Sequence, residues 1–160
     1  MRIREIKKED NEALAKIIRQ NLEAYGLDVP GTVYFDSGLD SLSDFYLEKK
    51  DKRRYLILED DDKEVLGGVG LAEFENIEGA AELQKIYLKD EAKGRGLGSL
   101  LMGSLEAAAR ELGYKKLYLE THSNLAIAIE MYRKLGFIQI QKPDFVNHDA
   151  MDHFFIKDLI

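Results

Sequence analysis

The chain has 160 residues, of which 45% are hydrophobic and 33% are charged, and this balance predicts one globular domain, residues 1–160, with a core of its own. Its net charge of −7 argues against a broad nucleic-acid-binding surface, because such a surface needs a basic face. The absence of cysteine excludes disulfides, thiolate zinc sites and cysteine nucleophiles, and since the three histidines show no HExxH spacing, we expect no metal.

The amino-terminal stretch MRIREIKKED carries charges throughout, unlike a signal peptide. No apolar run approaches the ~18 residues that a membrane span needs. We therefore expect a cytoplasmic protein that does not associate with membranes.

The first part of the chain predicts a strand and two helices with a loop between them. Alternating residues predict a strand over 2–6, and apolar residues at helical spacing predict a helix over 7–26 that Gly26 ends. Proline and glycine make 28–38 a loop, and a shorter helix follows over 41–50.

Three strands are predicted next, over 54–59, 64–74 and 80–88. The second of them contains three glycines within four residues, Gly67, Gly68 and Gly70. Such glycines indicate a bulge or the close approach of another group.

The last part of the chain predicts two helices and three strands. The helices cover 97–112 and 125–136, and the strands cover 115–122, 137–141 and 153–160. Asn124 is placed to cap the second helix. The order of elements predicts a mixed sheet with helices packed on it, either α/β or α+β.

The segment AKGRGLGS, residues 92–99, joins a predicted strand to a predicted helix. The first turn of a helix has unpaired main-chain N–H groups and about half a positive charge. Glycines let such N–H groups converge, and Lys93 and Arg95 add positive charge. The loop therefore suits a phosphate or a pyrophosphate.

Two common phosphate-binding patterns do not fit this loop. The dinucleotide pattern GxGxxG fails because Ser99 stands where the third glycine belongs, and the P-loop pattern fails because Ser99 follows Gly98 where lysine is required. A plain glycine-rich turn is the alternative, but the two cations and the following helix favour phosphate binding.

Several segments together resemble the GNAT N-acetyltransferase superfamily. KGRGLG resembles its R/Q-x-x-G-x-G/A loop, ELQKIYL and KLYLET resemble its fourth and fifth strands, and AIEMYRKLGF resembles its A-x-x-x-Y-x-x-x-G-F helix and strand start. These segments come in family order at family spacing from Glu82 to Phe137. GTVYFD, LETHS and NHDAM also look like a bacterial GNAT group that occurs fused to MarR-type regulators.

The resemblance implies a mixed, mostly antiparallel, splayed seven-stranded sheet with about four helices. It also implies acetyl-coenzyme A (acetyl-CoA) in the splay, with its pyrophosphate on the loop and its pantetheine arm along the edge of the 80–88 strand. The implied contacts are Ile86, Tyr87, Leu88, Lys93, Gly94, Arg95, Gly96, Leu97, Gly98 and Ser99. The family often places an Asn seven residues before the helix Tyr. Here that position is Leu125, so Asn124 is either a cofactor contact or only a helix cap.

Without a cysteine nucleophile, the expected reaction is direct attack of a primary amine in a ternary complex. The resemblance places Tyr132 beside the sulfur, where it could serve as the acid; the alternative is a tyrosine that only packs on the sheet. Glu82 precedes Ile86 by four residues, so we expect both on one strand face, with Glu82 acting as base through a water. Glu82 could also be a solvated or ion-paired residue. Rival bases are Glu120, His122 and His148.

The acceptor site is expected between the early helices with their loop and the connection before the last strand. Candidates are Tyr25, Tyr34, Asp36 and His148, which would suit a cationic amine from a small molecule or a peptide. The alternative is that these residues pack the helices on the sheet. A homodimer could form by pairing of the 153–160 strand. Rival functions are a non-catalytic acyl-CoA sensor on the same fold and a nucleotide-binding protein of another fold.

Overall fold

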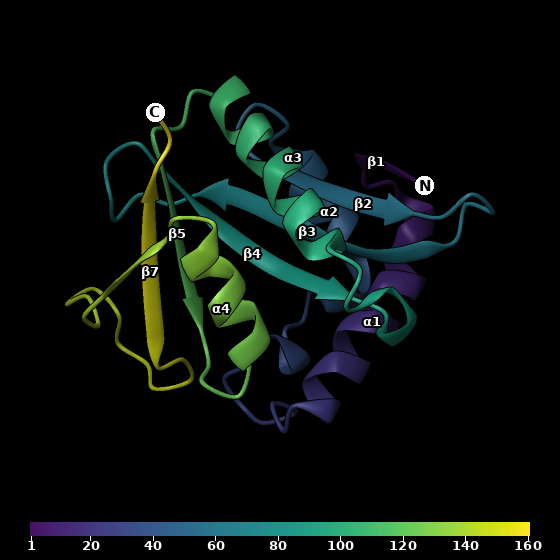
Figure 1. The fold of residues 1–160 in the computed structure, drawn as a ribbon, viewed down its shortest axis with the longest axis horizontal. Coiled ribbons are helices and arrows are strands. Elements are labelled where there is room, and N and C mark those ends of the chain that lie inside the picture. The colour runs from purple at the N-terminus through teal and green to yellow at the C-terminus, as the bar shows by residue number, and fades with distance from the viewer.

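Seven strands form one sheet in the computed structural model, which describes residues 1–160 (Figure 1). The strand order is β1-β2-β3-β4-β5-β7-β6, and every neighbouring pair is antiparallel except β4 and β5. The strands are β1 (Arg2–Glu5), β2 (Arg54–Glu59), β3 (Val65–Glu73), β4 (Ala80–Leu88), β5 (Lys116–Thr121), β6 (Ile138–Ile140) and β7 (His153–Asp158). The predicted mixed, mostly antiparallel sheet is confirmed.

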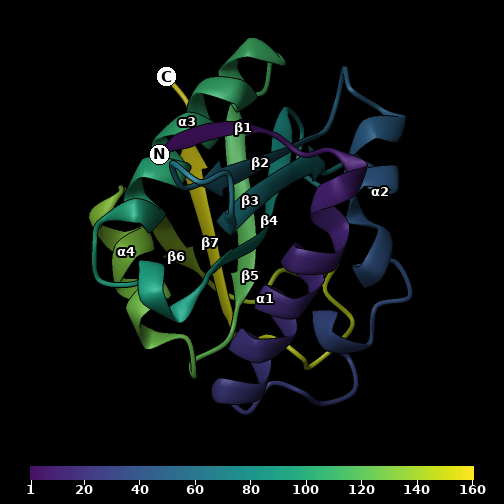
Figure 2. The ribbon, with the colours of Figure 1, turned by 90° about the vertical axis from the view of Figure 1, so that its right-hand side faces the viewer.

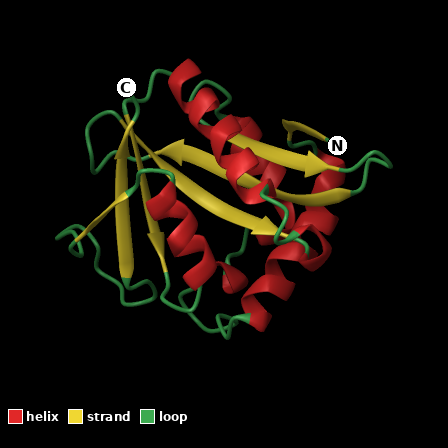
Figure 3. Cartoon of the chain, in the orientation of Figure 1, coloured by secondary structure: helices red, strands yellow, loops and turns green.

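Four α-helices cover the two faces of this sheet. They are α1 (Asn11–Ala24), α2 (Leu42–Glu48), α3 (Leu97–Glu111) and α4 (Ala126–Lys134). Figure 2 shows α1 and α2 on one face and α3 and α4 on the other, and Figure 3 shows helices both in front of the sheet and behind it. Each face has its own core, with 20 buried residues in the cluster under α3 and α4 and 13 in the cluster under α1 and α2. None of the helices is long and apolar enough to cross a bilayer.

Glycine gives β3 the space for two tyrosine rings. A Cβ on Gly70 would lie 2.7 Å from both the Tyr46 hydroxyl and the Tyr55 ring, and a Cβ on Gly68 would lie 2.5 Å from Tyr55. The predicted close approach is therefore confirmed. The two hydroxyls reach across to β4, where Tyr46 donates to the Gln84 side chain at 2.6 Å and Tyr55 donates to the Lys85 carbonyl at 2.8 Å.

The hydrogen bonds of these two tyrosines stabilise a bulge in β4. The register of β3 against β4 shifts between Gly68 and Gly70, and Lys85 has a φ of 53°. The extra residue changes which face each later side chain occupies. Gln84 therefore contacts Tyr46 under α2, while Ile86 packs against the cluster under α3 and α4.

The sheet opens between β4 and β5. These parallel strands pair only where 80–82 of β4 meet 116–118 of β5, and beyond that they diverge, as Figure 1 shows. The edge of β4 from Leu83 to Leu88 consequently has no strand partner on its β5 side. This is the splay that the resemblance implied.

The last long strand is not available for a dimer contact. β7 lies between β5 and β6 and pairs with both of them. The expectation that residues 153–160 pair across a dimer is therefore wrong, because a strand already flanked on both sides has no free edge. The edge position belongs to β6, which corresponds to the strand predicted over 137–141.

Candidate active site

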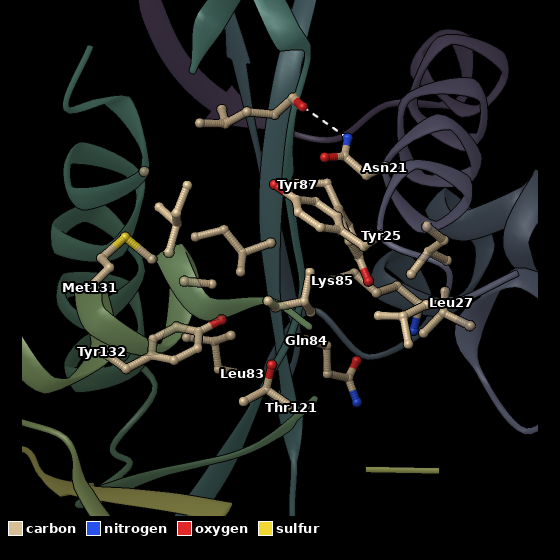
Figure 4. A pocket seen from close by; sticks show the side chains of 18 of the residues that line it. Asn21, Tyr25, Leu27, Leu83, Gln84, Lys85, Tyr87, Thr121, Met131 and Tyr132 are labelled. Atoms are coloured by element: carbon tan, nitrogen blue, oxygen red, sulfur yellow. Dashed lines mark hydrogen bonds between the residues drawn. The ribbon is translucent and has the colours of Figure 1, made fainter. Parts of the chain in front are cut away.

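A cavity of about 690 Å³ fills the splay between β4 and β5. Its walls come from β4, the glycine loop, α4, the end of α1 and two connections, 28–38 and 143–152. Figure 4 shows side chains from both faces of the sheet converging on it. Its size is in the range of small-molecule sites, and both sheet cores border it.

The glycine loop presents a row of free amides at one end of this cavity. None of the six main-chain N–H groups from Gly94 to Ser99 donates to an acceptor of the chain; Leu100 N–H is the first that does, to Gly96 at 3.2 Å. Gly94 and Gly96 have φ values of 73° and 74°, which turn the chain into α3. Left-handed backbone favours glycine, so these two positions set the path of the loop.

The two cations of the loop are placed differently. Lys93 lines the cavity, with Nζ 2.9 Å from an Asp90 oxygen and 5.2 Å from the centre of the Tyr25 ring. Arg95 is exposed and is not part of the cavity wall. Gly94, Gly96, Leu97, Gly98 and Ser99 all line the cavity.

The end of β4 forms the central wall of the cavity. Ile86, Tyr87 and Leu88 all line it. Asn21 of α1 donates its side-chain amide to the Leu88 carbonyl at 2.9 Å, the dashed line in Figure 4. This bond ties α1 to the strand end that leads into the glycine loop.

Tyr132 projects from α4 toward the middle of the cavity. The ring is buried against Phe137 and Phe155, with only 3% of the residue exposed, yet the hydroxyl has no hydrogen-bond partner in the chain and faces the cavity in Figure 4. Burial, with a smaller effect of Tyr87, raises the pKa of this phenol well above its usual value. The group is therefore protonated at neutral pH and able to donate.

Glu82 lines the same cavity, as expected, but it lies on the opposite face of β4 from Ile86. It accepts a hydrogen bond from Gln84 at 2.8 Å, and Gln84 faces Tyr46. The bulge at Lys85 separates Glu82 from the face of Ile86, so the expected shared strand face is wrong. Burial raises the pKa of the Glu82 carboxyl, and nearby Glu120 adds to that rise.

The rival bases are already engaged with one another or with the backbone. Glu120 lies 3.1 Å from the His148 ring and accepts from the Tyr118 hydroxyl at 2.9 Å; Glu120 and His148 line the cavity beside Glu82. His122 lies outside the wall and accepts from the Asn124 N–H at 3.0 Å. Glu82 is the carboxylate of this group that contacts only a side-chain amide.

Asn124 neither caps a helix nor lines the cavity. α4 starts at Ala126, its N-cap residue is Leu125, and no side chain caps it. The Asn124 side chain instead donates to the Tyr25 carbonyl at 2.9 Å, 99 residues away in the chain. The predicted cap is wrong because the chain turns one residue later, which frees Asn124 to join α4 to the end of α1.

The structure places some of the acceptor-site candidates in the cavity wall and one in the core. Tyr25, Asp36 and His148 line the cavity, whereas Tyr34 packs with the core under α1 and α2. Asp36 and His148 come from the connections 28–38 and 143–152. These two connections meet at the cavity, since a Cβ on Gly31 would lie 3.4 Å from the Ala150 side chain.

Lys85 is a charged cavity residue that the sequence analysis missed. Its side chain is 16% exposed, and Nζ lies 4.0 Å from an Asp36 oxygen, beyond hydrogen-bond distance. Burial lowers the pKa of this ammonium, and Asp36 and Glu82 partly oppose that effect. A lysine inside a strand pattern gives no sign of a bulge, so nothing in the sequence singled it out.

Sequence comparisons find a matching family and a similar bacterial protein. The acetyltransferase (GNAT) family matches residues 14–137. The uncharacterised N-acetyltransferase YjgM of Escherichia coli K12 is 37% identical over 140 residues, which cover 86% of this chain and 82% of that protein.

Solved structures agree on the fold. A GNAT-family acetyltransferase of Staphylococcus aureus superposes with a TM-score of 0.85 at 18% identity, covering 99% of both chains. The PaiA N-acetyltransferase of Thermoplasma acidophilum, solved with coenzyme A, gives a TM-score of 0.78 at 22% identity over 98% of both chains.

Proposed function

We propose, because this chain belongs to the acetyltransferase (GNAT) family, that it moves the acetyl group of acetyl-CoA to a primary amine by direct attack in a ternary complex. Membership in the family makes the chain an acyltransferase. The co-substrate, the amine and the roles of single residues are the parts that we propose.

One observation supports acetyl-CoA as the co-substrate. Six main-chain amides without partners lie at the start of α3, beside the unpaired edge of β4. Converging N–H groups at a helix start suit a pyrophosphate, with Lys93 adding charge at the same end of the cavity. An extended pantetheine arm could hydrogen-bond with the free edge at Ile86 and Leu88 as an added strand does. PaiA, which shares this fold, was solved with coenzyme A, and this is consistent with the proposal.

Acetyl-CoA supplies an activated thioester, so the chain itself has to manage two proton movements. The attacking amine must lose a proton, and Glu82, with a raised pKa and a cavity-facing position, takes it through a water. The departing thiolate must be stabilised, and the Tyr132 hydroxyl donates to it. Because the chain has no cysteine, an acyl-cysteine intermediate is excluded.

Calorimetry and a thiol-release assay test this function together. We expect saturable heat when the purified protein is titrated with acetyl-CoA, and thiol release when an amine from a panel of amino acids, amines and peptides is added. No heat at millimolar acetyl-CoA would contradict the co-substrate. Saturable binding without release on any amine would favour an acyl-CoA sensor instead.

A further inference from the structure

The ammonium of Lys85 is held in the cavity without a hydrogen-bond partner. Its nearest carboxylate oxygen, on Asp36, is 4.0 Å away, and no acceptor of the chain takes a hydrogen bond from Nζ. The side chain is nonetheless only 16% exposed. In Figure 4 it points toward Leu27, away from Tyr132. A largely buried side chain whose ammonium opens into the cavity with unused donors favours an anionic group beside it.

Buried contacts fix the backbone that carries this side chain. Lys85 stands at the bulge with a φ of 53°, and its carbonyl accepts a hydrogen bond from Tyr55 at 2.8 Å. Tyr55 is 1% exposed, and Gly68 and Gly70 make room for its ring. The core therefore fixes the backbone position from which the Lys85 side chain enters the cavity.

The cavity wall around Lys85 carries both signs of charge. Asp36 lies 4.0 Å from the ammonium, and Asp36 and Glu82 both act on its pKa. Glu120, which also lines the cavity, acts on the pKa of Glu82. A dicationic amine held by Asp36 would bring like charge close to the Lys85 ammonium. An acceptor with a cationic and an anionic end matches a wall that offers both carboxylates and an ammonium.

We propose that Lys85 binds the carboxylate of a zwitterionic acceptor, so that this enzyme prefers α-amino acids to amines that lack the carboxylate. The ammonium of the acceptor would then lie toward Glu82, and its side chain would face the apolar wall formed by Leu27, Val33 and Met151. This inference names the acceptor class and rests on the proposed function above.

Two acceptors that differ in one group test it, namely L-leucine and L-leucinamide. Their amines differ in intrinsic basicity, so the informative quantity is how the ratio of kcat/KM for leucine over leucinamide changes between the wild type and Lys85→Met. We expect that ratio to fall about tenfold or more in the variant, the factor that a charge-assisted hydrogen bond commonly contributes. Lys85→Arg should restore part of it. Lys89→Met, which removes an ammonium outside the cavity, should leave it unchanged.

Product binding gives a readout that does not need turnover. In the presence of coenzyme A, N-acetyl-L-leucine should bind the wild type more tightly than N-acetyl-L-leucinamide, and Lys85→Met should remove the difference. Equal leucine-to-leucinamide ratios in wild type and Lys85→Met, or no preference for the acetylated acid, would overturn the inference. Acetylation of leucinamide with no carboxylate preference would leave the proposed acetyltransferase intact, whereas failure to bind acetyl-CoA would remove both.

Discussion

Asn21 of α1 and Leu88 of β4 are joined by a hydrogen bond of 2.9 Å between a buried side-chain amide and a main-chain carbonyl. The same amide also donates to the Ile17 carbonyl at 2.9 Å. The residues are 67 positions apart, and the bond fixes the distance between α1 and the strand end that precedes the glycine loop. It thereby couples the stability of the fold to the shape of the cavity.

Asn21→Leu is expected to lower the free energy of unfolding by about 1–3 kcal/mol, because a partly buried carbonyl loses its partner. The same change should weaken acetyl-CoA binding severalfold, since the end of β4 is released. Denaturant unfolding and calorimetry measure the two effects. Asn11→Ala is the matched control, because Asn11 bonds Ser43 of α2 at the opposite end of α1 from Asn21. It should reduce stability and leave acetyl-CoA affinity unchanged; a similar loss of affinity there would refute the coupling.

Two glycines at the start and in the middle of α3 should respond in opposite ways to alanine. Gly96 has a φ of 74°, so Gly96→Ala forces a left-handed conformation that costs roughly 1–2 kcal/mol. It should also weaken acetyl-CoA binding, because the loop amides lose their direction. Gly103 is helical, and nothing lies within 4 Å of its added Cβ, so Gly103→Ala should stabilise the protein by about 0.5–1 kcal/mol. Thermal unfolding and calorimetry on both variants check this, and unchanged affinity in Gly96→Ala would contradict the role of the loop.

Local patterns were enough to predict the strands, the helices and the glycine loop. Gly26 follows its helix with positive φ, as its position indicated, and Gly113 and Gly136 follow the later helices in the same way. These features depend on residues close together in the chain, and the order of segments was sufficient to recognise the family.

The cavity depends on contacts that no local pattern carries. The bulge at Lys85 exists because Tyr46 and Tyr55 reach it from α2 and β2, so strand periodicity put Glu82 on the wrong face. Asn124 bonds a carbonyl 99 residues away, and the cap rule could not anticipate that partner. The sequence therefore predicted which residues gather at the site better than it predicted how they point.

Tyr132→Phe should reduce kcat about 100-fold or more with little change in acetyl-CoA affinity. The variant keeps the buried ring and removes only the cavity-facing hydroxyl, and a positioned acid commonly contributes a factor of this size. Tyr114→Phe removes a hydroxyl that bonds the Lys52 carbonyl away from the cavity, so it should keep normal kcat. Steady-state kinetics and calorimetry separate the two parameters. Near-normal turnover by Tyr132→Phe would exclude the tyrosine as the acid.

Glu82→Gln should make the protein more stable at neutral pH while it slows the reaction. Burial raises the pKa of Glu82 in the folded state above its value in the unfolded chain. The folded state therefore binds the proton more tightly, so the favourable contribution of this group is fully present below the unfolded pKa and is lost as pH rises through the folded one. Gln resembles the protonated form and can still accept from Gln84, whose bond to Glu82 is 2.8 Å.

The difference in Tm between Glu82→Gln and wild type should accordingly be positive at pH 7.5 and shrink as the pH falls toward 4. Other carboxylates that are paired in the fold, such as Asp10 with its lowered pKa, destabilise both proteins in acid and cancel in the difference. The kcat/KM of the variant should be lower than that of the wild type and should lose the part of its pH dependence that reports the base. A Tm difference that stayed constant with pH would mean that Glu82 titrates as it does in the unfolded chain, and the assignment of the base would then pass to Glu120 or His148, the neighbouring groups of the same wall.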